Sequence, residues 1–142
     1  MSQVTASIGR TRYKTILNSE NHELVGDEPA PYGTDLGPNP YDFLLMGLGS
    51  CVAMTLRMYA DRKKWDLQSV EVRLDQSRVY EKDCENCESN EGFVHKIKKS
   101  IKLTGNLDKD QRARLMEIAE KCPVNKTLTN EIRMETRGVI QI

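Results

Sequence analysis

The stretch that decides the fold is 39-NPYDFLLMGLGSCVAMTLRMYADRKKW-65, whose pattern predicts one long helix. Asn39 is suited to cap this helix, Pro40 fits its first position, and Asp42 lies in its first turn. From Phe43 to Tyr59 the segment is apolar on nearly every side, which is typical of a helix buried on all sides or of a membrane span. A span requires about 20 mostly apolar residues, and an internal arginine and a polar end interrupt the run. We therefore predict a core helix.

A cysteine, Cys51, lies at the middle of the predicted helix, and Gly47 and Gly49 precede it. Each glycine inside a helix costs roughly 1 kcal/mol relative to alanine. The pair therefore predicts that another group approaches the backbone closely there. A buried free cysteine is usually an inert small hydrophobe, so Cys51 alone leaves a structural and a catalytic role open.

Length and composition favour one small domain over residues 1–142. Lys plus Arg and Asp plus Glu both number 21, and this balance gives no reason to expect binding to nucleic acid or to an anionic membrane. No N-terminal apolar run resembles a signal peptide, so we expect a cytoplasmic protein. A chain with 30% charged residues has a small core, yet its central helix is apolar on every side. We therefore predict a homodimer.

The remaining pattern predicts short strands around the helix, followed by two more helices. Residues 29–40 contain four of the five prolines and two glycines, which is typical of an ordered loop with a function. The order ββ-β-α-ββ-αα-β makes the fold class α+β. The predicted elements are two strands within 3–17 that turn at Gly9-Arg10, a strand at 22–27, strands at 67–80 and 94–103, helices from Asp108 and over 123–129, and a last strand at 132–139.

Cys122 is followed by Pro123, which suits the first position of a helix and so places Cys122 at an N-cap. Free N–H groups and the helix dipole favour a thiolate there, and Lys121 and Lys126 are close in sequence. A cysteine that only caps and packs is an equally good interpretation.

Cys84 and Cys87 form a CxxC within the acidic segment 81–92, the predicted tip of a hairpin. Only His95 accompanies them, whereas a structural zinc ion normally takes four ligands, so a zinc site within one chain is disfavoured. Acidic neighbours oppose thiolate formation, which also disfavours a thioredoxin-like role. For these two cysteines, a role as an accessory dithiol or as an occasional disulfide is still an open alternative. Neither histidine belongs to a recognisable triad, and the phosphate-loop, dinucleotide and HExxH motifs are absent.

Together, the GPNP loop, the helix FLLMGLGSCVAMTLRMYADRKKW and the later EIAEKCPVNKTL resemble the OsmC/Ohr family of osmotically inducible and organic-hydroperoxide-resistance proteins. The resemblance covers nearly the whole chain, and the segment DCENC resembles the branch of OsmC-like redox proteins. It implies an OsmC-like fold, with antiparallel sheets packed around a long central helix. It also implies an intertwined homodimer with active sites at the subunit interface.

The resemblance further implies a thiol peroxidase. Cys51 corresponds to the peroxidatic cysteine and Cys122 to the resolving one, and no cofactor is expected beyond an external dithiol that reduces their disulfide. An apolar helix wall made of Leu44, Leu48 and Met54 favours small apolar hydroperoxides as substrates. The alternative is a weakly catalytic or non-catalytic redox-sensing or ligand-binding member of the fold.

The family also uses an arginine of the N-terminal hairpin, for which Arg10 and Arg12 are the candidates. In the hydroperoxide-resistance branch a glutamate holds this arginine, but Tyr41 occupies that position here. Two alternatives are open: either Asp42 or Glu28 takes the place of the glutamate, or the arginine is not held at all.

Overall fold

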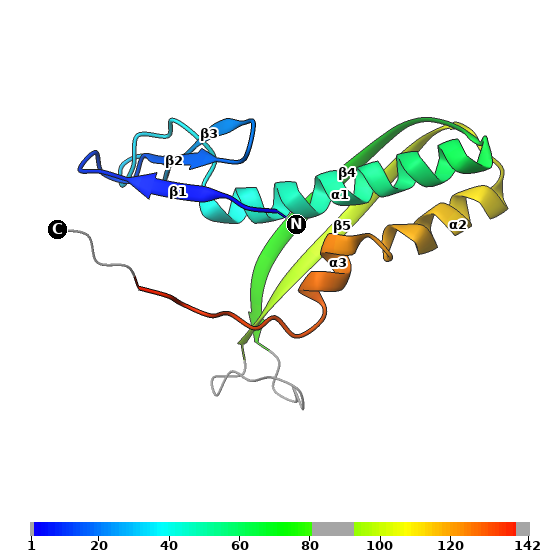
Figure 1. Ribbon diagram of the computed structural model, residues 1–142. Helices are drawn as coiled ribbons and strands as arrows, with labels where there is room; N and C mark the ends of the chain where they lie inside the picture. Colours follow the sequence, from blue (N-terminus) through cyan, green and yellow to red (C-terminus); the bar gives the residue numbers. More distant parts are fainter. Residues whose placement is uncertain (1, 81–92, 139–142) are drawn as a thin grey trace. The chain divides into compact units, whose positions relative to one another are not determined.

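The computed structural model describes residues 2–80 and 93–138, which form an α+β fold with antiparallel sheets and a long helix (Figure 1). Two compact units are present, Met1–Met46 and Gly47–Ile142. The boundary between them lies inside the long helix α1, Pro40–Lys63. The predicted hairpin tip at 81–92, with Cys84 and Cys87, lies outside the described residues.

The N-terminal unit contains a three-stranded antiparallel sheet in the order β1-β2-β3. All three strands were predicted, and the first two are separated by a turn that includes Gly9 and Arg10. Ile8 pairs with Thr15, and Thr15 in turn pairs with Gly26 on the third strand. The bounds are β1 Thr5–Ile8, β2 Thr15–Asn18 and β3 Glu23–Gly26.

A buried carboxylate, Asp27, organises the proline-rich loop that follows β3. Its Oδ2 accepts hydrogen bonds from Thr34 Oγ1 (2.6 Å) and from the N–H of Leu36 (3.2 Å), and its Oδ1 accepts one from the N–H of Glu28 (2.8 Å). The hydrogen bond from Thr34 makes the largest contribution to a lowered pKa of the Asp27 carboxyl. The loop is therefore ordered, as its composition predicted.

Two glycines allow this loop to fold back closely on the backbone. A Cβ atom at Gly33 would lie 2.1 Å from the carbonyl oxygen of Glu28, and one at Gly37 would lie 1.9 Å from that of Val25. No side chain fits at such distances, so both positions require glycine.

The predicted N-terminal cap of helix α1 is present, and the C-terminal end of the helix is capped as well. The N–H of Asp42 donates to Asn39 Oδ1 (2.9 Å), and the N–H of Asn39 donates back to Asp42 Oδ2 (3.2 Å). At the other end, Lys64 adopts a φ of 58°, and the N–H of Trp65 reaches the carbonyl of Ala60 (2.9 Å). These contacts satisfy backbone groups that the helix leaves without partners.

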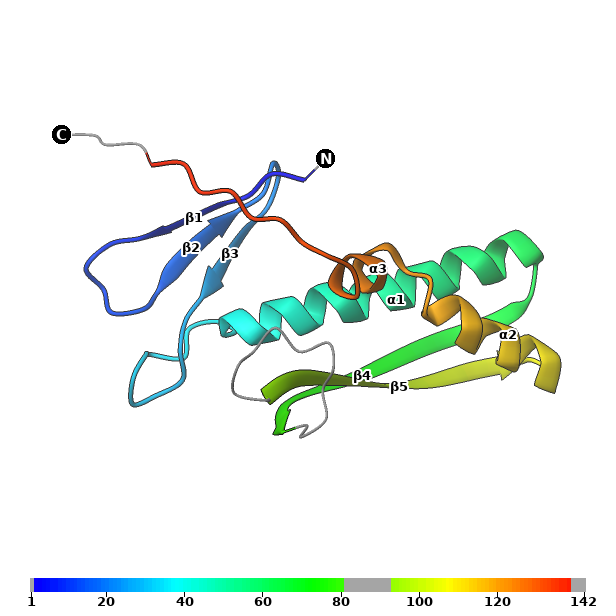
Figure 2. The same cartoon turned by 90° about the horizontal axis from the view of Figure 1, so that it is seen from below.

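The second unit is built on an antiparallel hairpin of β4, Asp66–Tyr80, and β5, Phe93–Asn106. Helix α2, Lys109–Ala119, and the Gly47–Lys63 part of α1 lie on one side of this hairpin (Figure 2). Alternation places an apolar row on that side and a mostly polar row on the other. The apolar row contains Val70, Val72, Leu74, Ile97, Ile101 and Leu103.

Local sequence signals also explain the two shorter helices. Asp108 and Gln111 form the predicted reciprocal cap of α2, with hydrogen bonds of 2.8 and 3.0 Å. Helix α3, Pro123–Leu128, begins with proline at its first position. Both predicted helices are therefore confirmed.

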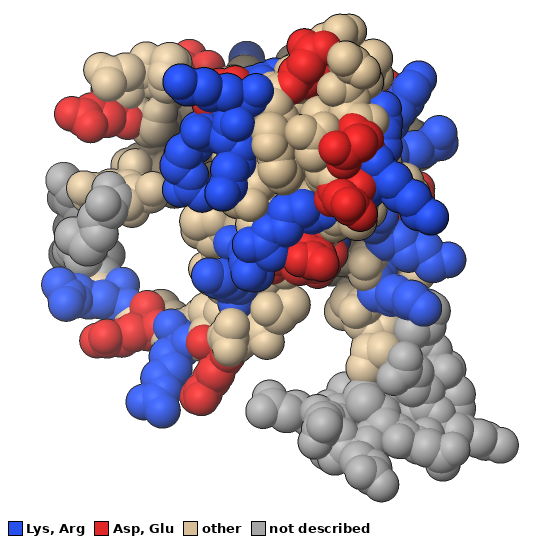
Figure 3. All heavy atoms as spheres, turned by 90° about the vertical axis from the view of Figure 1, so that its right-hand side faces the viewer, with Lys and Arg blue, Asp and Glu red and all other residues tan. Residues whose placement is uncertain are grey.

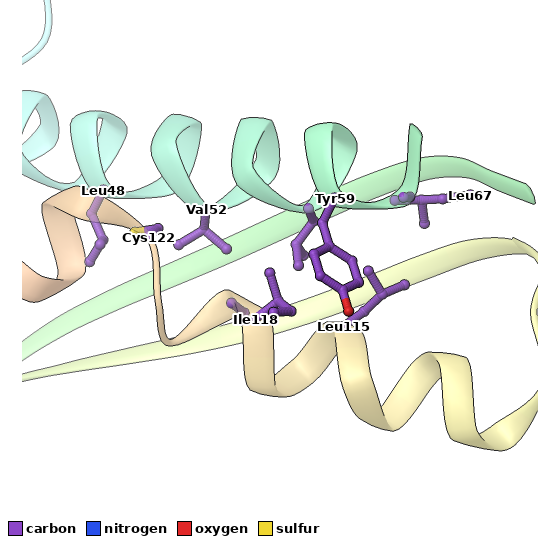
Figure 4. Close-up of a cluster of buried hydrophobic side chains, with 10 residues drawn as sticks. Leu48, Val52, Tyr59, Leu67, Leu115, Ile118 and Cys122 are labelled. Carbon is purple, nitrogen blue, oxygen red and sulfur yellow. The ribbon is translucent and has the colours of Figure 1, made fainter. Parts of the chain in front are cut away.

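The core of the second unit lies between α1, α2 and the hairpin. Figure 4 shows Leu48, Val52 and Tyr59 of α1 extending toward Leu115 and Ile118 of α2. The fully buried side chains are Val52, Leu56, Ala60, Leu115, Ala119 and Cys122.

Within one chain the predicted core helix α1 is buried on one face only, and its all-round apolar surface is the feature from which a partner subunit was predicted. Exposed fractions reach 63% at Met54 and 70% at Met58, whereas Leu56 is 0% exposed. The reason is that the hairpin and α2 cover only one face of the helix. Helix α1 is long and apolar enough to cross a membrane, with a mean hydropathy of 1.4 over its most apolar 18 residues, and core helices of soluble proteins share this property. Its buried row packs against other elements of the chain, as in such a core helix.

The prediction of a last strand at 132–139 is wrong for residues 132–138, which are the part of it that the structure describes. Residues 131–138 form neither helix nor strand, and Ile132 and Met134 are 49% and 89% exposed. Alternation specifies which side chains share a face of a strand. The strand itself needs the backbone hydrogen bonds of a neighbour, and the described part of this chain offers none to the segment.

Basic and acidic side chains are both present on the face shown in Figure 3. Ion pairs also lie along the helices: Arg57 lies 2.6 Å from Asp61, and Arg114 lies 2.8 Å from Glu117.

Candidate active site

The two cysteines singled out by the sequence lie together in the second unit. Cys51, on α1, is half-buried at the edge of the core, and Cys122, just before α3, is fully buried. Cys51 packs against the core cluster that contains Cys122, and its side chain is close enough to the Cys122 thiol to raise the pKa of that thiol. Figure 4 shows Cys122 beside Leu48 and Val52 of α1. A separation of 71 residues in sequence thus becomes direct contact in space.

The segment around Cys122 has the predicted N-cap geometry. Cys122 is extended, with φ −64° and ψ 143°, and its Sγ accepts the N–H of Asn125 at 3.2 Å. The Asn125 side chain is held as well, because its Nδ2 donates to the carbonyl of Glu120 (3.0 Å). The thiol is therefore fixed in position by its own helix start.

The pKa of Cys122 is shifted in the opposite direction to the one expected from its position at a helix start. Burial raises the pKa of the Cys122 thiol above its ordinary value, and contact with Cys51 raises it further. The N–H of Asn125 and the positive charge of Lys99 act in the opposite direction. The helix start does favour a thiolate as predicted, but desolvation in the core outweighs it. The two lysines expected to help, Lys121 and Lys126, are exposed.

An open cavity of about 700 Å³ lies beside Cys51. Its wall is mainly apolar, and Arg62 contributes a charge to it. Met54 belongs to this wall as expected, whereas Leu48 is only 3% exposed and packs in the core instead. The lining residues are Gly47, Ser50, Cys51, Met54, Thr55, Met58, Tyr59, Arg62, Ile118, Pro123 and Val124.

The two glycines before Cys51 have different neighbours. A Cβ atom at Gly49 would lie 2.7 Å from Leu74 Cδ1 on β4, so α1 approaches the hairpin closely there. Around a Cβ atom at Gly47 no atom lies within 4 Å, and this residue lines the cavity. The predicted close approach is therefore confirmed for Gly49 alone.

Tyr59, which lies among arginines, lines the same cavity, and the sequence patterns did not predict it as a site residue. Tyr59 Oη accepts a hydrogen bond from Arg114 Nε (3.1 Å), and the guanidinium carbon of Arg62 lies 5.3 Å from the ring centroid. The hydrogen bond from Arg114 is the main cause of a lowered pKa of Tyr59. Tyr59 and Arg114 are 55 residues apart in sequence, so no local signal was available.

The candidate arginines belong to the N-terminal unit. Arg12 Nη1 donates to the carbonyl of Pro31 (3.0 Å) and to that of Tyr32 (3.5 Å). Arg12 also has a φ of 39°, in the left-handed region that residues other than glycine adopt at a cost. Arg10 is exposed and lies in the same turn.

The candidate carboxylates serve the local structure of the same unit. Asp42 caps α1 through Asn39, and Glu28 lines a cavity of about 370 Å³ together with Tyr13 and Phe43. Tyr41, where the resemblance implies a glutamate, is 55% exposed.

One further residue that the sequence analysis missed is Lys99 on β5. It interrupts the inward-facing apolar row of Ile97, Ile101 and Leu103, and its side chain is only 12% exposed. A lysine at an inward position of an otherwise alternating strand is a signal that the sequence does contain.

In the described part of the chain, no group of three or more His, Cys, Asp or Glu side chains is placed to hold a metal ion. Cys84 and Cys87 lie outside that part.

Comparisons with known proteins identify relatives of the fold. The family model described as OsmC-like protein matches residues 33–137, which include parts of both units. No curated protein matches the chain by sequence.

Several solved structures are similar to the chain at low sequence identity. An OsmC-like protein from Mycoplasma pneumoniae has a TM-score of 0.72 at 18% identity, covering 90% of this chain and 86% of that one. An organic hydroperoxide resistance protein OsmC from Legionella pneumophila has a TM-score of 0.65 at 20% identity, covering 91% and 89%. An organic hydroperoxide resistance protein from Elizabethkingia anophelis has a TM-score of 0.66 at 19% identity, covering 91% and 88%.

Proposed function

Because the chain belongs to the OsmC-like protein family, we propose that it is a thiol-dependent peroxidase that reduces organic hydroperoxides. One observation carries the proposal. The thiols of Cys51 and Cys122 are in contact, and Cys51 lines an apolar cavity that is open to a small substrate.

The reaction proceeds in three balanced steps. The Cys51 thiolate attacks one peroxide oxygen, the O–O bond breaks, and the alkoxide leaves and takes a proton to become the alcohol. The resulting Cys51 sulfenic acid condenses with Cys122, which forms a disulfide and releases water. An external dithiol then reduces the disulfide by thiol–disulfide exchange, so that the cycle requires no bound cofactor.

Other residues supply charge and selectivity. Arg10 or Arg12 provides the cation that stabilises the Cys51 thiolate and polarises the peroxide. The apolar wall that includes Met54, Met58 and Val124 favours an alkyl or lipid hydroperoxide over hydrogen peroxide, because an alkyl chain leaves water on binding there.

The active form in this proposal is a cytoplasmic homodimer, and its active sites lie at the subunit interface. The exposed apolar face of α1 supports the dimer, since a second copy would remove Met54 and Met58 from water. Neither a nucleic acid nor a membrane is a partner.

A second candidate function is a redox sensor or ligand-binding module that turns over little substrate. Two observations favour it. Tyr41 replaces the glutamate expected to hold the arginine, and the raised pKa of Cys122 leaves little thiolate at neutral pH to resolve a sulfenic acid.

Thiol accounting after peroxide treatment tests both functions. The reduced protein receives one equivalent of an alkyl hydroperoxide, then an alkylating agent, and is analysed by intact mass and peptide mapping. The peroxidase predicts a Cys51–Cys122 disulfide within seconds and its recovery by a dithiol. Survival of both thiols, or oxidation confined to Cys84 and Cys87, overturns it.

Variants sharpen this experiment. Cys51→Ser is expected to abolish turnover, and Cys122→Ser to leave a sulfenic acid that dimedone traps. The double variant Cys84→Ser/Cys87→Ser is the control and retains turnover. Arg10→Met and Arg12→Met, measured separately, identify the arginine that serves the thiolate.

A further inference from the structure

An almost buried lysine approaches the resolving cysteine from the hairpin. The register pairs Lys99 with Leu74, the residue that contacts α1 at Gly49. Lys99 therefore lies on the inward face of the hairpin, in the section of the core that contains Cys51 and Cys122. A buried ammonium group is costly unless it is paired and hydrogen-bonded, so its presence in an apolar row needs an explanation.

The contacts of Lys99 lead directly to Cys122. Lys99 Nζ donates to Asn125 Oδ1 at 2.7 Å, and it lies 3.2 Å from Glu120 Oε1. The same Asn125 donates its backbone N–H to the Cys122 sulfur. One asparagine thus holds the ammonium group on its side chain and the thiol on its backbone. The carboxylate of Glu120 is 65% exposed, so it neutralises the lysine only in part.

The charges around Cys122 single out Lys99. Among the described residues, Cys51 of α1 and Lys99 of β5 act on the Cys122 thiol, and Lys99 is the cation, with a side chain that is only 12% exposed. The other charged groups belong to the segment of Cys122 itself and are exposed, namely Glu120, Lys121 and Lys126.

We infer that Lys99 is a positioning residue that supplies the positive charge for ionisation of Cys122 and thereby promotes the resolving step. In that step the Cys122 thiolate attacks the sulfenic sulfur of Cys51, a sulfur–sulfur bond forms and the sulfur–oxygen bond breaks. The leaving hydroxide takes up the proton that Cys122 released on ionisation and becomes water. Desolvation of the core opposes the thiolate, and Lys99 offsets part of that penalty. This kinetic role rests on the proposed peroxidase function, whereas the effect on ionisation does not.

Titration of Cys122 tests the ionisation directly. In the Cys51→Ser background, 13Cβ-cysteine NMR follows the Cys122 resonance against pH and requires no access for a reagent. Lys99→Met is expected to raise the pKa of Cys122 by about one unit, and Lys99→Arg to keep it within a few tenths. Glu120→Gln is expected to lower it, because the lysine then loses its counter-charge.

The matched control is Lys98→Met, which removes a neighbouring exposed lysine from the same strand and is expected to leave the pKa of Cys122 unchanged. Opposite shifts in Lys99→Met and Glu120→Gln support the inference, since a merely structural bridge would be weakened by both. An unchanged pKa in Lys99→Met, or shifts of the same sign in both variants, overturns it. Thermal melts verify that each variant is folded.

Single-turnover kinetics test the resolving step in the protein with Cys51 intact. Disulfide formation after one equivalent of hydroperoxide is expected to be about threefold slower in Lys99→Met at pH 7. The reason is that the smaller fraction of ionised Cys122 outweighs the higher nucleophilicity of the thiolate that does form. Above the pKa of the variant thiol the deficit is expected to vanish. A deficit that is the same at every pH overturns the role in ionisation. If no disulfide forms in the wild-type protein, the peroxidase function fails while the NMR result still decides the effect of Lys99.

Discussion

The two faces of helix α1 between Gly47 and Lys63 have the same apolar character but different surroundings. Leu48, Val52 and Leu56 are at most 3% exposed, whereas Met54 and Met58 are 63% and 70% exposed. Apolar composition thus does not decide burial within one helix. The neighbours that the rest of the chain supplies decide it, and they cover one face.

Cys51 lies where these two faces meet. Its thiol contacts Cys122 at the core, and the residue also lines the cavity on the open side. In the proposed peroxidase, a nucleophile at this border would combine access for a substrate with contact to a second, buried thiol. Substitutions on the two sides of this border should therefore differ in their effects on stability and on association.

The largest expected contrast is between core and surface truncations on α1. Leu56→Ala should lower the free energy of unfolding by about 3 kcal/mol, because it leaves a cavity in a packed core. Met54→Ala should cost the dissociated chain less than about 1 kcal/mol, since within one chain that side chain has few atoms around it. Urea denaturation of both variants at the same protein concentration, below the dissociation constant of the proposed dimer, measures both. Equal losses would contradict the assignment of faces.

The next contrast concerns what covers the open face. Met58→Glu places a carboxylate in the proposed dimer interface and should raise the dissociation constant at least about 100-fold, because burying an unpaired charge is costly. Analytical ultracentrifugation across a concentration series measures it. Met116→Glu, at an exposed position on α2, is the control and should leave the dimer intact. A wild-type chain that is monomeric at micromolar concentration would refute the dimer itself.

Smaller effects are expected at the two glycines. Gly49→Ala should lose about 1 kcal/mol of stability, because contact with Leu74 outweighs the gain in helix propensity. Gly47→Ala should gain up to about 1 kcal/mol, since its Cβ meets open space. Thermal unfolding of both variants provides the comparison. The double variant Gly49→Ala/Leu74→Val, in which the neighbouring side chain is shorter, should recover part of the stability that Gly49→Ala loses. If the effects of the two single substitutions on stability are strictly additive, the clash is excluded.

The smallest expected effect is a dependence of stability on alkaline pH. Burial raises the pKa of Cys122 in the folded chain above its unfolded value, so the stability from burying the neutral thiol is complete below an unfolded pKa of about 8.5. That contribution should decrease as pH rises through the folded pKa, by at most about 1.4 kcal/mol per pH unit. Urea titrations under reducing conditions measure the slope. Cys122→Ala should lack it, and an identical slope in both proteins would contradict the prediction.

The element order was predictable because its signals are local. Reciprocal caps at Asn39–Asp42 and Asp108–Gln111 place helix starts through hydrogen bonds that span three residues. The last strand was not predictable in the same way, because Ile132 and Met134 alternate correctly but pairing requires a distant partner. The site shows the same division. Cys51 and Cys122 were found through local patterns and family resemblance, whereas Lys99 and Arg114 act through residues far from them in sequence.

The sequence by itself determined the elements up to α3, the N-terminal helix caps, the family and the pair of cysteines. Each of these depends on side-chain types within a few residues of one another, or on motifs that belong to the family. Only the tertiary structure decided that the two thiols touch, that desolvation makes Cys122 a weaker acid, and that Lys99 faces the core. The physical reason is that burial and charge–charge distance depend on the packing of α1, α3 and the hairpin, which the linear order of residues does not specify.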